Sequence, residues 1–481
     1  TVSGWKELLK GLTVSNSADK QVNQVTIDEQ HRYDMFDLND IQYAYWAGRD
    51  NKNMLLSNNA CCTYFELDMP NLDIEKFKHI LKCLEQRHDM LRCRMNKDAK
   101  QYIVKDEYST VVVYDYKSIS DMRKHLDNIR TTMSYEILPI DKPMFKVAIT
   151  KLDDINYRIH FSIDFMIADA MSLYIFWKDM GKLYNGEILE PLTITYKDYL
   201  NYLNNSSDIK AKHDVDKKYW LSKIEDFPKS PELPFKSSEF VDNKHKFVRR
   251  RKNINPEQWK KFTQNCAKYG LTPSSALFTL YAEVLSAFGG GSSFAIMMTV
   301  FNRENINKDV QKIIGDFTKL ALIDVHRKDT TVSKNALDIQ STIMNSISHT
   351  EYSATEFVGE LRKHFNEDRM YTVVFTSAIG IDDLNKDISD NDAIFLKSSN
   401  SLISSTPQVC IDHQIFYEDK DIVLSWDTLD GVFMDNVVRA MFDVYTSLVD
   451  KAIENPEFFN QTLIDLRPSY QVEVHDKANM T

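Results

Sequence analysis

The chain has 481 residues, of which 43% are hydrophobic and 27% charged, and its formal net charge is −11. This length exceeds what one hydrophobic core usually supports, so we expect two domains, and the acidic balance argues against a nucleic-acid surface. No apolar run reaches the roughly 20 residues of a membrane span, and the short amphipathic N-terminus lacks the features of a signal peptide.

The six cysteines show no zinc-binding spacing, and Cys61 and Cys62 are adjacent. We therefore predict reduced thiols in a cytoplasmic protein. None of the six lies beside an obvious base, which argues against a catalytic cysteine. The sequence also contains no GxGxxG, P-loop, HExxH or GxSxG motif.

The first half of the chain alternates between predicted helices and strands. Apolar residues recur at helical spacing in four segments, at residues 37–48, 73–87, 121–133 and 168–183. Segments rich in strand-forming residues cover residues 61–69, 109–114, 145–151 and 157–163. This interleaving predicts a mixed α/β lobe.

A proline-rich segment, FPKSPELPF at residues 227–235, separates this half from the next. Neither a helix nor a central strand accepts three prolines in nine residues, so we expect an extended linker or crossover. Predicted strands of the second half cover residues 246–252, 294–300, 320–325, 372–376, 409–416 and 422–427. Predicted helices cover residues 256–269, 274–288, 331–349, 354–364 and 434–453.

Two similar α/β lobes with a cleft between them form the simplest architecture for this order of elements. We place the N-terminal lobe at residues 31–205 and the C-terminal lobe at residues 206–465. A linker is expected at residues 1–30, and another at 466–481 that leads toward a following domain.

The segment DFMIADAMS, residues 164–172, lies at a predicted strand-to-helix junction. Asp164 and Asp169 have Ile, Phe and Met as neighbours, and a carboxylate in such surroundings is paired, hydrogen-bonded or protonated. Two interpretations of Asp169 stay open at this point. It could contribute to a functional site, or it could be an ordinary carboxylate at a helix N-terminus.

Several segments, in order, resemble the heterocyclization domains of nonribosomal peptide synthetases, a branch of the condensation-domain superfamily. Asp164, Asp169 and Ser172 fill the pattern Asp-x4-Asp-x2-Ser, and Phe165 stands where condensation domains carry their catalytic histidine. The other matching segments are FDLNDIQYAYWAGRD (36–50), RHDMLR (87–92), FPKSPELPF (227–235), GDFT (315–318), VVFTS (373–377), STPQVCIDHQ (405–414) and WDTLDGVF (426–433). The resemblance covers residues 30 to 435.

Two residues depart from the family's usual pattern. Ser405 stands where the family often has Gln, and Cys410 where it often has an aromatic residue. We expect both to affect how a substrate fits.

The resemblance implies a V-shaped pseudodimer of two lobes, each like chloramphenicol acetyltransferase, with a tunnel at their junction. It implies an acyltransferase that condenses a carrier-bound acyl or peptidyl donor with carrier-bound Cys, Ser or Thr. A cyclodehydration to a thiazoline or oxazoline then follows. The expected partners are upstream and downstream peptidyl carrier proteins and an adjacent adenylation domain. The carriers deliver phosphopantetheine, and no directly bound cofactor or metal is expected.

The same resemblance places the catalytic pair at Asp412 and Thr376, in the second lobe. Cyclodehydration needs a group that takes a proton from the nucleophile and returns one to the departing oxygen, and a partly desolvated carboxylate can do both. Asp164 and Asp169 are the alternative carboxylates, and a purely structural role for Asp412 or Thr376 also stays open. Ser377 is the alternative to Thr376.

Further residues are expected to support this site. Gln414 lies two positions after Asp412 on a strand and therefore faces the same side, whereas His413 faces the opposite side and is expected to be structural. Asn302 and Arg303 follow a buried strand. We expect Asn302 to contact the substrate and Arg303 to pair with a carboxylate of residues 164–172, joining the lobes.

Structural roles are expected for Tyr43, Tyr45 and Trp46 in the core, and for Arg87 and His88 at the end of a helix. Two alternative functions stay open: a plain amide-forming condensation domain, and an inactive relative that only docks carrier proteins. Phe165 argues against the former, because it provides no imidazole.

Overall fold

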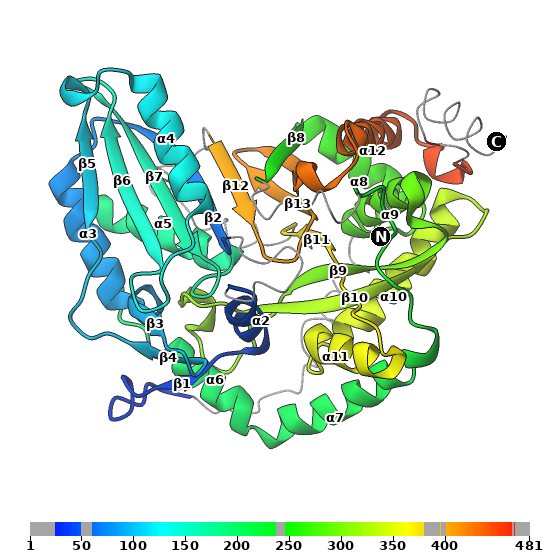
Figure 1. The fold of residues 1–481 in the computed structure, drawn as a ribbon, viewed down its shortest axis with the longest axis horizontal. Helices are drawn as coiled ribbons and strands as arrows, with labels where there is room; N and C mark the ends of the chain where they lie inside the picture. Colours follow the sequence, from blue (N-terminus) through cyan, green and yellow to red (C-terminus); the bar gives the residue numbers. More distant parts are fainter. Residues whose placement is uncertain are drawn as a thin grey trace.

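The computed structural model describes residues 25–49, 60–236, 246–379, 395, 401–463 and 466. Two β-sheets lie side by side, each packed against helices (Figure 1). Most of the predicted linker at residues 1–30, and all but Leu466 of that at 466–481, lie outside the described residues. Within the described part, no helix is long and apolar enough to cross a membrane.

The first lobe contains a five-stranded sheet with strand order β12-β2-β7-β6-β5. Only β5 and β6 are parallel, and the other neighbours pair antiparallel. The strands are β2 (Cys62–Pro70), β5 (Val111–Asp115), β6 (Phe145–Lys151), β7 (Asn156–Asp164) and β12 (Ser401–Ser405).

Helices cover both faces of this sheet. Apolar residues of α3 (Ile74–Arg87) and α5 (Ala170–Tyr184) pack on one face, and those of α4 (Met122–Tyr135) pack on the other. A small sheet of β1 (Phe36–Asp37), β4 (Lys100–Ile103) and β3 (Cys93–Met95) packs against the same core. The four strands and the four helices predicted for this half, of which the first is α2 (Asp40–Arg49), are therefore confirmed, while β1, β3 and β4 were not predicted.

The second lobe contains a six-stranded sheet with strand order β10-β9-β11-β13-β14-β8, in which β11 is parallel to both of its neighbours. The strands are β8 (Val248–Ile254), β9 (Ser293–Phe301), β10 (Thr318–His326), β11 (Val373–Ser377), β13 (Ile411–Glu418) and β14 (Asp421–Thr428). The helices are α8 (Pro256–Lys268), α9 (Pro273–Leu285), α10 (Val332–Ser348), α11 (Ala354–Phe365) and α12 (Val437–Glu454). The predicted order of strands and helices is confirmed here too.

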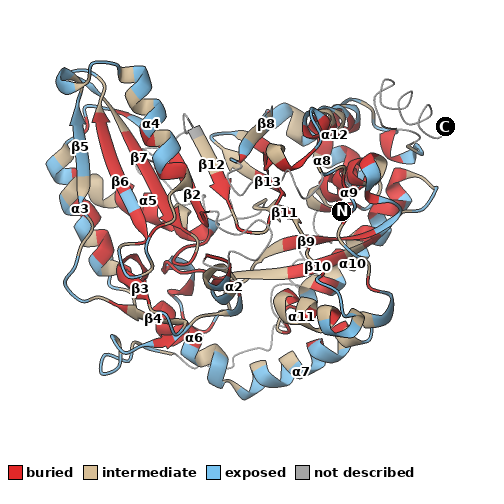
Figure 2. Cartoon of the chain, in the orientation of Figure 1, coloured by how far each residue is buried: buried red, intermediate tan, exposed pale blue. Residues whose placement is uncertain are grey.

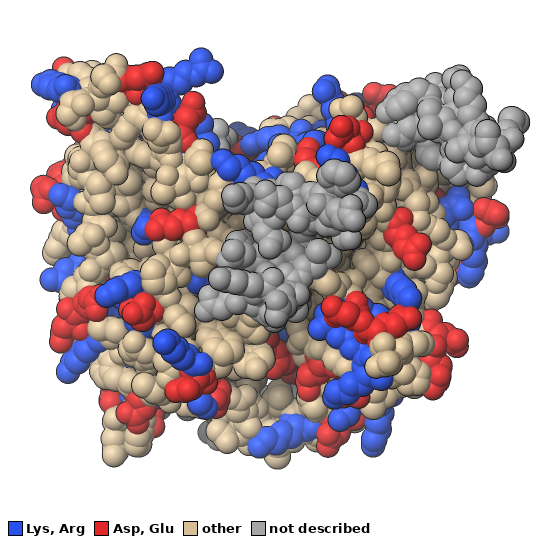
Figure 3. Space-filling view, in the orientation of Figure 1, with Lys and Arg blue, Asp and Glu red and all other residues tan. Residues whose placement is uncertain are grey.

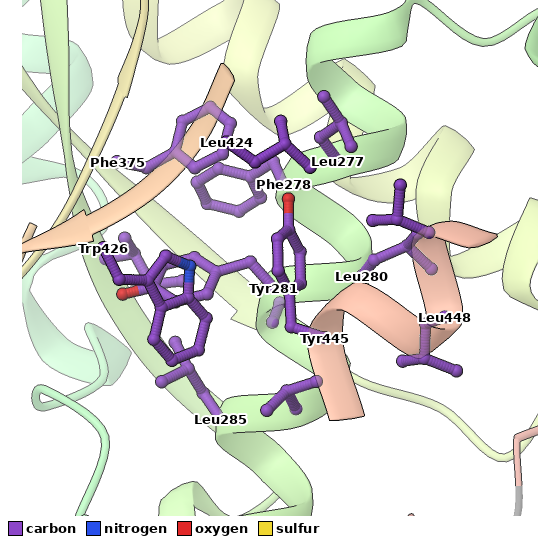
Figure 4. Packing of buried hydrophobic residues seen from close by; sticks show 14 of the residues in the cluster. Leu277, Phe278, Leu280, Tyr281, Leu285, Phe375, Leu424, Trp426, Tyr445 and Leu448 are labelled. Atoms are coloured by element: carbon purple, nitrogen blue, oxygen red, sulfur yellow. The ribbon is translucent and has the colours of Figure 1, made fainter. Parts of the chain in front are cut away.

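Aromatic side chains fill much of the second core, between the sheet and α9 and α12 (Figure 4). Tyr281 of α9 packs edge-on against Trp426 of β14 with ring centroids 5.1 Å apart, and Trp426 lies 5.5 Å from the Tyr445 ring. Helix α11 covers the opposite face of the sheet through Phe357 and Leu361. The buried residues of both lobes lie along the sheets and on the inner faces of the helices (Figure 2). This packing fixes the sheet strands that carry Asp412 and Thr376.

Three parts of the chain connect the lobes. Helix α2 (Asp40–Arg49) lies near the centre of the molecule in Figure 1, and helices α6 (Tyr196–Asn205) and α7 (Ser207–Leu221) lie along its lower side. β12 follows the second-lobe strand β11 in sequence, yet it pairs with β2 of the first sheet. Ile313 and Phe317 also pack into the first core. The lobe boundary at 205/206 falls between α6 and α7 and stays a prediction.

On the face shown in Figure 3, basic side chains lie among acidic ones across both lobes. Many of these groups form ion pairs, such as Arg158 Nε with Asp68 Oδ1 at 2.7 Å. The described part of this face therefore presents no broad basic surface.

Candidate active site

Two cavities meet at the junction of the lobes. One has a volume of about 320 Å³ and is lined largely by apolar side chains, including Met297, Val358 and Met370. The other has a volume of about 290 Å³ and contains Phe165 and Phe416 in its wall. Both cavities share the same five lining residues, Tyr45, Thr299, Thr376, Thr406 and Asp412.

Asp412 lies on β13, and its residue is 9% exposed. Gln414 Nε2 donates a hydrogen bond of 2.5 Å to Asp412 Oδ2, and the Thr376 hydroxyl lies 3.4 Å from Oδ1. Burial, with a smaller contribution from the nearby Asp427 carboxylate, raises the pKa of Asp412 to about 6. The Gln414 bond, the charge of Arg249 and the Thr376 bond act in the opposite direction. Near neutral pH this carboxyl can therefore accept a proton and return it.

Thr376 is placed beside Asp412 by the parallel pairing of β11 with β13, which sets Val374 opposite Asp412. Thr376 Oγ1 also lies 3.0 Å from Thr299 Oγ1 on β9. Thr299 was missed by sequence reasoning, because only the β9–β11 register brings it opposite Thr376. Ser377, the predicted alternative, points to the other face of β11, where its Oγ lies 2.8 Å from Ser274 Oγ.

Gln414 is held on its far side by an arginine. Arg249 Nη2, from β8, donates to Gln414 Oε1 at 2.9 Å, and Arg249 Nε donates to Asp427 Oδ1 at 2.7 Å. Sequence reasoning missed Arg249 and Asp427, because their strands approach Gln414 only through the pairing of β14 with β8 and β13. The local signals were a run of three arginines at residues 249–251 and the family-like segment WDTLDGVF, which contains Asp427.

His413 faces the opposite side of the sheet from Asp412. Its Nε2 lies 2.6 Å from the Tyr445 hydroxyl in the aromatic core. Burial lowers the pKa of His413 to about 3, so the imidazole is neutral. This geometry matches the structural role expected for it.

Asp169 and Arg303 lie together across the lobe junction. Arg303 Nη2 lies 3.0 Å from Asp169 Oδ1, with the two side chains only 4% and 1% exposed. The guanidinium also stacks 3.9 Å from the centre of the Phe317 ring. Asp169 is at the same time the N-cap of α5, where it accepts the Ser172 backbone N–H at 2.7 Å. The helix N-terminus interpretation of Asp169 is therefore confirmed, while its contribution to a functional site stays a prediction.

Ser172 strengthens this junction. Its Oγ lies 2.7 Å from the carbonyl oxygen of Gly315, a residue of the GDFT segment. Asp164, in contrast, pairs with Arg49 of α2 inside the first lobe and accepts the backbone N–H of Met166 at 3.0 Å. The two alternative carboxylates, Asp164 and Asp169, therefore each have a buried arginine as partner.

Asn302 lies apart from Asp412. Its Nδ2 donates to Glu304 Oε1 at 3.1 Å, and its side chain lines a third cavity, of about 400 Å³, together with Asp316 and Lys319. The structure therefore does not bring Asn302 to the proton-transfer group.

Two tyrosines of α2 lie at the cavities that Asp412 borders. Tyr45 packs against the first core, as expected, but it also lines both cavities beside Asp412. Burial raises the pKa of Tyr45 well above its usual range, so this phenol stays protonated. Tyr43 was also expected in the core, but it is 55% exposed and lines the 320 Å³ cavity. The expectation of a core position was therefore wrong for Tyr43.

The cysteines and the two departures from the family pattern lie outside this chemistry. All six cysteines are free. Burial raises the pKa of the Cys410 thiol to about 12, and its Sγ donates to the Thr372 carbonyl at 3.3 Å. Ser405 Oγ donates to the Ala60 carbonyl at 2.8 Å. Both side chains therefore bond to backbone. The described residues contain no cluster suited to a metal ion.

The two-lobed fold and the paired cavities define the class of this protein. The chain belongs to the condensation-domain family, whose sequence profile, described as "Condensation domain", matches residues 33–468.

Among its relatives are phenyloxazoline synthase MbtB of Mycobacterium tuberculosis and bacitracin synthase 1 of Bacillus licheniformis. The former is 28% identical over 451 residues, which are 92% of this chain and 31% of that protein. The latter is 27% identical over 466 residues, which are 94% of this chain and 9% of that protein. The chain therefore spans a third or less of these two relatives.

The fold matches solved structures over most of its length. The cyclization-docking bidomain of the EpoB nonribosomal peptide synthetase from Sorangium cellulosum has a TM-score of 0.81 and 26% identity, covering 95% of this chain and 92% of that chain. The synthetase FmoA3 matches in fold with a TM-score of 0.82 and 22% identity, covering 96% of this chain and 47% of that chain. The predicted α/β fold with two lobes, and the resemblance to heterocyclization domains, are confirmed.

Proposed function

We propose that this domain makes a thiazoline or (methyl)oxazoline ring from a carrier-bound acyl or peptidyl donor and carrier-bound Cys, Ser or Thr. The observation that carries the proposal is Asp412, a buried carboxyl whose pKa is raised to about 6, at the meeting point of two cavities. The similarity to a phenyloxazoline synthase and to a cyclization domain supports the same reaction.

The first step is condensation. The α-amine of the acceptor attacks the donor thioester carbonyl, a C–N bond forms, and the C–S bond breaks to release the donor carrier's thiol. The two cavities bring the reacting groups together, which is a large part of the catalysis of a bimolecular reaction. Phe165 occupies the wall of one cavity and supplies no base.

The second step is cyclodehydration, and it needs two proton relays. Asp412 takes the proton of the side-chain thiol or hydroxyl as this group attacks the new amide carbon, and passes the proton to the former carbonyl oxygen. It then takes the proton of the ring nitrogen and passes it to the departing hydroxyl, which leaves as water while the C=N bond forms. Asp412 ends in its starting state.

Thr376 and Gln414 orient the Asp412 carboxylate during both relays. Their bonds to opposite oxygens of the carboxylate restrict its rotation. The phosphopantetheine arms belong to the upstream and downstream peptidyl carrier proteins, and an adenylation domain loads the acceptor carrier. This assembly would work in the cytoplasm.

One assay tests the reaction against its alternatives. Loaded donor and acceptor carriers are mixed with the domain, and the mass of the product on the acceptor is measured. We expect the amide minus one water, with acceptors bearing Cys, Ser and Thr compared in parallel. The intact amide alone would indicate a plain condensation domain, and no product would indicate an inactive docking relative.

A further inference from the structure

A hydrogen-bonded chain leads from β8 to the catalytic carboxyl. Arg249 Nη2 donates to Gln414 Oε1 at 2.9 Å, and Gln414 Nε2 donates to Asp412 Oδ2 at 2.5 Å. A guanidinium can only donate, so it bonds the oxygen of the amide and leaves the NH₂ group to face Asp412. The direction of the whole chain therefore depends on Arg249.

We propose that Arg249 is a positioning residue for ring formation, which acts by holding the Gln414 amide with its NH₂ group against Asp412. This inference rests on the proposed cyclodehydration. Without Arg249 the amide is free to rotate by half a turn. Its oxygen would then face the carboxylate, and that contact is favourable only when Asp412 is protonated.

Arg249 is itself held in place. Its Nε donates to Asp427 Oδ1 at 2.7 Å, and a second bond joins Nη2 to Oδ2 of the same carboxylate. Asp427 lies directly opposite Asp412 in the β13–β14 register and is fully buried. Asp427 also accepts the backbone N–H of Ser404 from β12 at 3.1 Å. Arg249 therefore has two roles. It neutralises the buried Asp427 carboxylate, and it orients Gln414, which bonds Asp412.

Two neutral groups lie beside Asp412: the Thr376 hydroxyl of β11 and the Tyr45 phenol of α2, whose pKa is raised by burial well above its usual range. Two charged residues line the cavities that Asp412 borders, Arg362 of α11 in one and Asp169 in the other, and each is ion-paired. The pH dependence of ring formation in the neutral range therefore follows the pKa of Asp412, which Asp427 raises and Arg249 lowers.

The test replaces Arg249 and measures ring and linear amide separately. In Arg249→Met we expect the ratio of cyclised to linear product to fall about threefold near pH 6.5, because a rise of about one unit in the pKa of the catalytic carboxyl, from about 6, lowers its ionised fraction by about that factor at this pH. The midpoint of the pH profile of ring formation should move to higher pH, while amide formation is unchanged. Arg249→Lys, which keeps the charge but not the planar fork, should be intermediate.

A second variant removes the charge imbalance. In Arg249→Met with Asp427→Asn no buried carboxylate is left without its partner, so folding is protected. The product ratio should still be low, because the amide is still unanchored. Full recovery of ring formation in this double variant would overturn the proposal, because Arg249 would then act only by neutralising Asp427.

The control is Arg251→Met, two residues along β8 on the same face, which breaks an ion pair with Glu418 that is more exposed than the pair of Arg249 with Asp427. It should leave the ratio and the pH profile unchanged. The Asp412 carboxyl can also be titrated without substrate, by infrared difference spectra against Asp412→Asn. If the titration midpoint of Asp412 were the same in Arg249→Met as in the unaltered domain, the proposal would be contradicted. This titration stays informative even if the unaltered domain forms only the amide, which would refute the proposed function instead.

Discussion

The two lobes each bring a buried aspartate to their junction, but they hold it in opposite ways. Asp169 of the first lobe has a guanidinium 3.0 Å away and a helix N-terminus beneath it. Among the described residues, Asp412 of the second lobe has only an amide and a hydroxyl as side-chain hydrogen-bond partners, and its arginine lies one side chain further out. A carboxylate that is bonded directly to a cation is suited to holding two elements together, whereas one that is bonded through neutral groups can exchange protons.

This difference predicts opposite results from the same substitution. Removing the charge of Asp169 should weaken the junction and affect every activity of the domain. Removing the charge of Asp412 should abolish one chemical step and leave the fold intact. The experiments below test each half of that comparison.

The largest effect is expected from Asp412→Asn. Loss of a general acid–base group typically costs about 10²- to 10⁴-fold in rate. We expect ring formation to fall by that factor while linear amide still accumulates on the acceptor carrier. The readout is the mass of the acceptor-bound product over time. The matched control is Asp421→Asn, which lies on β14 at the end of the β13–β14 pair farthest from Asp412. Normal ring formation in Asp412→Asn would show that another group transfers the protons.

The next largest effect concerns the junction. Breaking a buried ion pair on one side leaves an uncompensated charge and costs about 3–5 kcal/mol of unfolding free energy. Asp169→Asn and Arg303→Met should each destabilise the domain by amounts in this range, as measured by denaturant unfolding. Amide formation and ring formation should decline together.

A double-mutant cycle isolates the pair itself. Because Asp169 and Arg303 contact each other, the double variant should lose less than the sum of the two single losses. A coupling energy of zero would show that the ion pair does not join the lobes.

The pH dependence of stability should also distinguish Asp412 from Asp169. The folded pKa of Asp412, about 6, lies above its unfolded value, so the ionised carboxylate destabilises the native state at neutral pH. At pH 7.5 the Asp412→Asn variant should therefore be more stable than the unaltered domain, by about 1–3 kcal/mol for a shift of about two units. The gain should shrink as the pH falls below 6 and disappear below about pH 3, where Asp412 is protonated in both the folded and the unfolded state.

Asp169→Asn provides the contrast in that experiment, because it should be less stable than the unaltered domain at pH 7.5. Denaturant midpoints at several pH values measure both variants. If Asp412→Asn were destabilised at pH 7.5 as well, the two carboxylates would have the same structural role, and the distinction between the lobes would fail.

The sequence was sufficient for the family and for most of the helices and strands. Alternation and helical spacing located the sheet strands, and the proline-rich segment marked the division between the halves. β12 was missed because SLISS has no strong strand pattern of its own, and it forms only by pairing with β2 of the other lobe. Tertiary pairing of this kind cannot be inferred from local propensity.

The site was predictable only in part, for a similar reason. Asp412 and Gln414 lie two residues apart, so strand alternation places them on one face. Arg249 and Asp427 approach them from other strands, and Tyr45 comes from a helix of the first lobe. Their roles depend on the register of β13, β14 and β8 and on how the two lobes contact each other. A sequence motif contains no information on either.

The smallest effect is expected from Thr376→Val, which keeps the shape of the side chain and removes its hydroxyl. Thr376 Oγ1 lies 3.4 Å from Asp412 Oδ1, a long contact, and Gln414 still holds the other oxygen. A hydrogen bond to a charged group contributes about 1.5–3 kcal/mol, so a tenfold slower ring formation with unchanged amide formation is a realistic result. Ser377→Ala removes a hydroxyl from the next position, on the opposite face of β11, and should change neither step. Equal effects of the two substitutions on ring formation would mean that β11 contributes rigidity to the second lobe rather than a bond to its carboxylate.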